Sequence, residues 1–80
     1  MSNLDTALRR SLEAELATDD TVADPSPEAH GHASELHREA AQWHSRSSNP
    51  RRAHLHRLQS TVHAAIAQQL RDQEAEGRST

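Results

Sequence analysis

The sequence lacks cysteine, phenylalanine and tyrosine, and it contains a single tryptophan, Trp43. Because there is no cysteine, a scaffold held together by disulfides is excluded. No apolar run approaches the ~20 residues that a membrane-spanning helix requires, so no membrane association is expected. The first residues, Met-Ser-Asn-Leu-Asp, also lack the basic segment and the apolar stretch of a signal peptide, and we therefore expect a cytoplasmic protein.

Large apolar side chains are scarce as well. Leu, Ile, Val, Met and Trp together supply 13 of the 80 residues. Burying one such side chain is worth about 1.5–3 kcal/mol, whereas ordering each residue of the chain costs about 1.5 kcal/mol. The chain is therefore poor in core for its length, and we expect it to complete its core with a second copy of itself or with another protein.

The apolar residues that are present recur with helical spacing, and no segment has the alternation of a strand. The first stripe consists of leucines four residues apart: Leu4, Leu8, Leu12 and Leu16. This stripe predicts an N-terminal helix over residues 1–18. Residues 19–26 are rich in aspartate and include Pro25, so they are predicted to form an acidic linker.

Two helix-start signals divide the rest of the chain. Ser26 followed by Pro27 predicts the start of one helix, and Asn49 followed by Pro50 predicts the start of another. A short turn between two amphipathic helices favours an antiparallel helical hairpin over residues 27–76, with a tail at residues 77–80. The sequence thus predicts one small all-α domain, built from an N-terminal helix, an acidic linker and a helical hairpin, that self-associates or is completed by a partner.

Histidine is unusually frequent, with seven residues, and five of them form two sets with a seven-residue spacing. The sets are His30, His37 and His44, and then His56 and His63. We expect these imidazoles to be solvated, along the border of the apolar stripe. Two alternatives stay open. A metal ion could take ligands from both hairpin arms, His37 or His44 with His56 or His63. The histidines could also sense pH, because seven added charges change the net charge from −3 to +4.

The predicted hairpin turn is rich in arginine. The residues concerned are Arg46, Arg51, Arg52 and Arg57. A helix N-terminus attracts anions, so these side chains are candidates for phosphate or nucleic-acid contact. Against that interpretation, the whole chain carries a net charge of −3, and no aromatic side chain lies between the arginines to stack on bases. A nucleic-acid-associated regulator is therefore the alternative function.

Catalysis has little support in the sequence. There is no cysteine nucleophile and no glycine-rich phosphate loop, and a small helical hairpin offers little concavity. We predict no catalytic residue, no bound metal and no cofactor. We predict instead a non-catalytic protein–protein interaction module, a regulator, adaptor or inhibitor, whose apolar helix faces pair with a second copy or lie in a partner's groove. The residues expected to make that contact are Trp43, Leu55, Leu58, Val62 and Ile66.

Overall fold

The computed structural model describes residues 2–79, and this part of the chain forms three α-helices and no strand. Helix α1 spans Asn3–Ala23, α2 spans Pro27–Arg46 and α3 spans Pro50–Ser79. The all-α prediction is confirmed. Within the described residues, none of the helices combines the length and the apolar character needed to cross a membrane.

The first two helices begin at side-chain caps. The Ser2 hydroxyl accepts a hydrogen bond from the N–H of Asp5, and the Ser26 hydroxyl accepts one from the N–H of Ala29. Pro27 occupies the first position of α2, where its missing N–H costs nothing. These local signals explain why the start of α2 could be predicted from the sequence.

The end of α1 corrects the predicted linker. The helix continues through residues 19–23, and only residues 24–26 connect it to α2. The aspartates and threonines of this segment do not break a helix by themselves, and Thr21 is buried, so packing favours continuation. The helix stops at Ala23 because Asp24 precedes Pro25, and a residue before proline disfavours the helical conformation.

The turn between α2 and α3 is short and closely hydrogen-bonded. Ser48 adopts a positive φ of 62°, and the N–H of Asn49 donates to the carbonyl of His44 at 2.8 Å. The Asn49 side chain then accepts from the N–H of Arg52 and so caps α3. The predicted tail at residues 77–80 would require α3 to end before Gly77, but the helix continues to Ser79. Thr80 lies outside the described residues.

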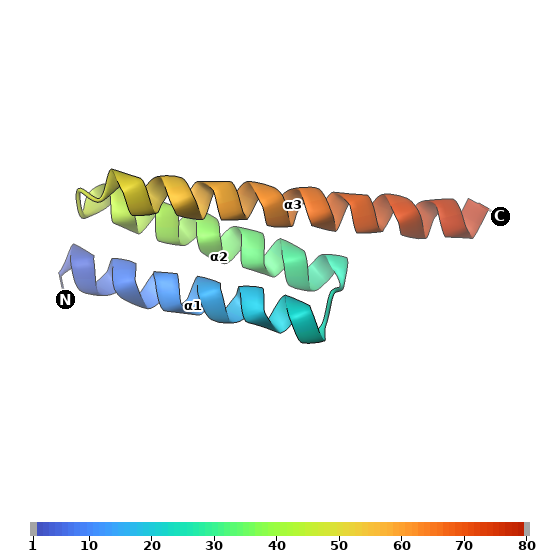
Figure 1. The fold of residues 1–80 in the computed structure, drawn as a ribbon, viewed down its shortest axis with the longest axis horizontal. Helices are drawn as coiled ribbons and strands as arrows, with labels where there is room; N and C mark the ends of the chain where they lie inside the picture. Colours follow the sequence, from blue (N-terminus) through green and yellow to red (C-terminus); the bar gives the residue numbers. More distant parts are fainter. Residues whose placement is uncertain (1, 80) are drawn as a thin grey trace.

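The helices lie side by side, with α2 between α1 and α3 (Figure 1). Both α1 and α3 pack along α2, and α3 runs past the ends of its neighbours at its C-terminal side (Figure 1). The molecule is correspondingly long and narrow, at 52 × 20 × 15 Å. Where α2 and α3 face each other, the hydroxyls of Ser34 and Ser60 each donate to the other residue's backbone carbonyl at 2.9 Å. Such contacts require a close approach of the two helices.

The core consists of small and polar side chains. Apart from Pro27 at the start of α2, its apolar members are alanines: Ala7, Ala14, Ala17, Ala33, Ala40, Ala41, Ala53 and Ala67. Its polar members are Ser11, Thr21, His30, Ser34, His37, His44, His56 and His63. The expectation of solvated border histidines is therefore wrong for five of the seven, and it holds for His32 and His54, which are exposed. The leucines of α1, by contrast, are 46–58% exposed.

Candidate functional site

Helix α3 carries two seams with the three- and four-residue spacing of a coiled coil. The inner seam is Ala53, His56, Ser60, His63 and Ala67, which are buried or half-buried. The outer seam is Leu55, Leu58, Val62 and Ala65, which are all exposed. Each outer residue follows an inner residue by two positions, which is about 200° around a helix. The two seams therefore lie on nearly opposite sides of α3, and Leu55, Leu58 and Val62 of the outer seam each keep half or more of their surface exposed.

The predicted contact residues fall on two different helices. Leu55, Leu58 and Val62 are 53%, 50% and 56% exposed on the outer seam. Ile66 is half-buried at its border. Trp43 belongs to α2 and is half-buried, and the guanidinium of Arg46 stacks over its ring at 4.8 Å from the centroid. The structure thus brings three of the five together on one face and leaves Trp43 on another helix.

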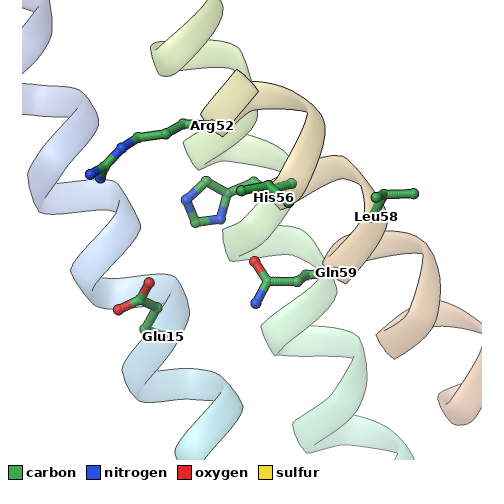
Figure 2. Close-up of a pocket in the computed structure, with 6 residues that line it drawn as sticks. Glu15, Arg52, His56, Leu58 and Gln59 are labelled. Carbon is green, nitrogen blue, oxygen red and sulfur yellow. The ribbon is translucent and has the colours of Figure 1, made fainter. Parts of the chain in front are cut away.

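The four arginines of the predicted anion site have separate surroundings. Arg46 contacts Trp43, and Arg57 donates to the Ser45 hydroxyl at 2.9 Å. Arg51 is exposed at the start of α3. Arg52 lines a groove of about 510 Å³ between α1 and α3, together with residues of both helices: Glu15, Leu55, His56, Leu58 and Gln59. Figure 2 shows the Arg52 side chain extending toward α1 and the Glu15 carboxylate facing α3.

A second candidate site lies in the core, where hydroxyls of α1 connect histidines of α2 and α3. The Ser11 Oγ lies 2.5 Å from Nε2 of His44 and 2.8 Å from Nε2 of His56. The other ring nitrogen of His56, Nδ1, lies 2.8 Å from Nδ1 of His37. One serine and one imidazole pair therefore join all three helices.

The same pattern repeats farther along the bundle. The Thr18 Oγ1 lies 2.7 Å from Nε2 of His37 and 3.0 Å from Nε2 of His63. Nδ1 of His63 then lies 2.9 Å from Nδ1 of His30. The hydrogen bonds form one continuous chain, which we name the histidine chain: His44, Ser11, His56, His37, Thr18, His63 and His30.

Each member of the histidine chain can donate once and accept once while it is neutral. A neutral imidazole has one N–H and one bare nitrogen, and a hydroxyl donates a single proton. An imidazolium donates from both nitrogens, so two imidazoliums facing each other across 2.8 or 2.9 Å would present two donors and no acceptor. Each of the two His–His pairs can therefore take up one proton but not two. The fully charged chain is incompatible with this core.

Burial is the main influence on these imidazoles, because a buried charge loses its hydration. Burial, to which His56 and His63 add, lowers the pKa of His37 to about 4. Burial also lowers the pKa of His63, and His30 adds to the effect. His37 and His63 are consequently neutral at pH 7, which is compatible with the hydrogen-bond pattern.

The two histidines nearest the turn respond to charged neighbours as well as to burial. The pKa of His44 is lowered by burial and then by Arg52. The pKa of His56 is lowered by burial and by His44, and the Glu15 carboxylate partly offsets this. The Nδ1 atom of His44 is buried and has no hydrogen-bond partner, so the histidine chain ends there on an unsatisfied nitrogen.

The metal alternative does not fit these distances. Of the predicted cross-arm pairs, His37 and His56 meet directly, as hydrogen-bond partners. Two nitrogens on one zinc ion, each about 2.0–2.1 Å from the metal in a tetrahedron, are farther apart than 2.8 Å. Among the described residues, no group of three or more His, Cys, Asp or Glu side chains is placed to hold a metal ion.

Sequence reasoning missed Ser11 and Thr18. The signal that identifies them is their own seven-residue spacing on α1, which matches the spacing of the histidines on α2 and α3. Comparison of the chain with protein-family models, curated proteins and solved structures gave no significant match.

Proposed function

We propose that this protein is a small, non-catalytic protein–protein interaction module that binds its partner through the outer seam of α3. The observation that supports the proposal is where the large apolar side chains lie: they usually fill the core, but here they are at the surface. The core is filled by alanine, serine and histidine, while Leu55, Leu58 and Val62 remain about half exposed. Contact with another protein would remove their apolar surface from water.

The spacing of the outer seam suits a helical partner. Its residues alternate three and four positions apart, as do those that insert between the side chains of a facing helix in a coiled coil. The seam forms a narrow stripe on a rigid helix, so a complementary amphipathic helix can lie along it. A regulator, adaptor or inhibitor needs such a face and no catalytic group.

Site-specific photo-crosslinking tests this proposal, in cells of the organism that naturally makes the protein. A photoreactive amino acid replaces Val62 on the outer seam, and a matched variant carries it at Thr61, which is exposed on α3 but outside the seam. We expect discrete adducts from position 62, few from position 61, and loss of the adducts when Leu58→Asp is added. Equal labelling at both positions, or adducts that persist with Leu58→Asp, would show that the outer seam is not the contact face.

A further inference from the structure

We infer that the partner of the outer seam is a second copy of this chain, with the two α3 helices antiparallel. This inference rests on the proposed function, because it names the partner of the same face. It is carried by the order of charges along the seam. Continued in both directions with the same spacing, the exposed positions read Arg51, Leu55, Leu58, Val62, Ala65, Gln69, Asp72 and Glu76. The stripe is therefore basic at one end, apolar in the middle and acidic at the other end.

Such an order is self-complementary in one orientation. Placing Leu58 against Val62 of the second copy also places Leu55 against Ala65. Arg51 then lies opposite Gln69, three residues or about 4.5 Å along the axis from Asp72 of the second copy. The apolar centres coincide, and each basic end lies near an acidic end. A parallel arrangement would place like charges together at both ends, which is unfavourable at close range.

The helix dipole gives a second and independent reason. A helix N-terminus carries partial positive charge and its C-terminus partial negative charge. The first turn of α3 contains Arg51 and Arg52 and no acidic residue, so the charge at this end opposes the dipole. The last turns contain Glu74 and Glu76 together with Arg78, so the C-terminal end carries charges of both signs. Antiparallel pairing brings Asp72 of one copy near the basic start of the other α3 and so compensates the mismatch at that end.

The length of α3 points the same way. The helix has 30 residues, against 20 in α2, and its C-terminal part projects beyond the other two helices (Figure 1). Residues 71–78 are exposed. With Leu58 against Val62, Pro50 of the second α3 lies opposite Leu70, so the basic start of that helix lies where this segment begins. The contact is a single pair of helices, a small interface of the kind found in weak or transient complexes.

Sedimentation equilibrium of the full chain over a range of concentrations tests the inference. We expect the mass to rise with concentration from 8.9 kDa toward twice that value. Leu58→Asp should keep the protein monomeric and helical. Leu12→Asp is the matched control, because Leu12 is 58% exposed on α1 and outside the seam, and it should leave dimerisation unchanged. A dimer that survives Leu58→Asp but is lost in Leu12→Asp would overturn the inference.

Charge reversal tests the antiparallel orientation of the two α3 helices. It also tests dimerisation through the outer seam if Leu58→Asp loses its helical circular dichroism signal. Arg51→Glu and Asp72→Arg should each weaken dimerisation several-fold, and the double variant should restore it. Failure of the double variant to recover would exclude antiparallel pairing. The wild-type chain could stay monomeric at millimolar concentration and still give seam-specific photo-adducts with another protein. That result would show that the partner is not a second copy of the chain, and it would leave the proposed function intact. Loss of the adducts as well would overturn both.

Discussion

Replacing Ser11 with alanine removes the hydroxyl that links two buried histidines. Its Oγ lies 2.5 Å from Nε2 of His44 and 2.8 Å from Nε2 of His56, and the serine is 6% exposed. The substitution leaves two imidazole nitrogens without a partner, at about 1–2 kcal/mol each. Alanine is the better helix former by about 0.5 kcal/mol, which offsets part of the loss. We therefore expect the free energy of unfolding to fall by about 1.5–3.5 kcal/mol.

Urea denaturation followed by circular dichroism, at one fixed protein concentration, measures this effect. A fixed concentration is needed because association would add to the apparent stability. Ser45→Ala is the matched control, since Ser45 also accepts a side-chain hydrogen bond, from Arg57, but is exposed on the same bundle. The control should change stability by less than about 0.5 kcal/mol. If Ser11→Ala costs no more than Ser45→Ala, the histidine chain does not contribute to the core as described.

Three further perturbations have defined outcomes. Acid should destabilise the fold: the unfolded chain takes up protons at His37 near pH 6.5, whereas the folded chain does so only near pH 4. Stability is therefore complete above about pH 6.5 and falls as the pH drops toward 4, by about 3 kcal/mol from this residue. Urea midpoints that are equal at pH 7 and pH 4.5 would contradict this. Gly31→Ala should raise the unfolding free energy by about 0.5–1 kcal/mol, because a Cβ would meet only Arg71, at an ordinary 3.7 Å. A lower melting temperature would show that the space around Gly31 is too small for a methyl group. Asn49→Ala should cost about 1 kcal/mol through loss of the cap on the Arg52 N–H, and an unchanged urea midpoint would argue against that cap.

The helix starts were predictable because their causes are local. Ser26 with Pro27, and Asn49 with Pro50, combine a side-chain acceptor with a residue that fixes the backbone of the first turn. The continuation of α1 through residues 19–23 was not predictable in the same way. Thr21 in this segment is buried, and its burial depends on tertiary packing.

Which face of α3 points inward could not be derived from its own sequence. Leu58 and His56 belong to seams with the same spacing, and a leucine stripe is ordinarily the buried one. The choice depends on Ser11 and Thr18, which satisfy the ring nitrogens from a different helix. With these partners the imidazoles can be buried without loss of hydrogen bonds. Leu55, Leu58 and Val62 were predicted from their pattern as partner-contact residues, and the structure leaves them exposed, while the contact itself stays a prediction.

The polar seam of α3 lies inside the bundle and its apolar seam lies outside. Nuclear magnetic resonance of the His37 imidazole, which is hydrogen-bonded to His56 of the inner seam, tests this placement, with the signal assigned by comparison with His37→Gln. We expect a folded-state pKa of about 4, so that the ring is still neutral near pH 5.5. A ring that titrates near the ordinary value of 6.5 would mean that His37 faces water, and the leucines would then belong to the core.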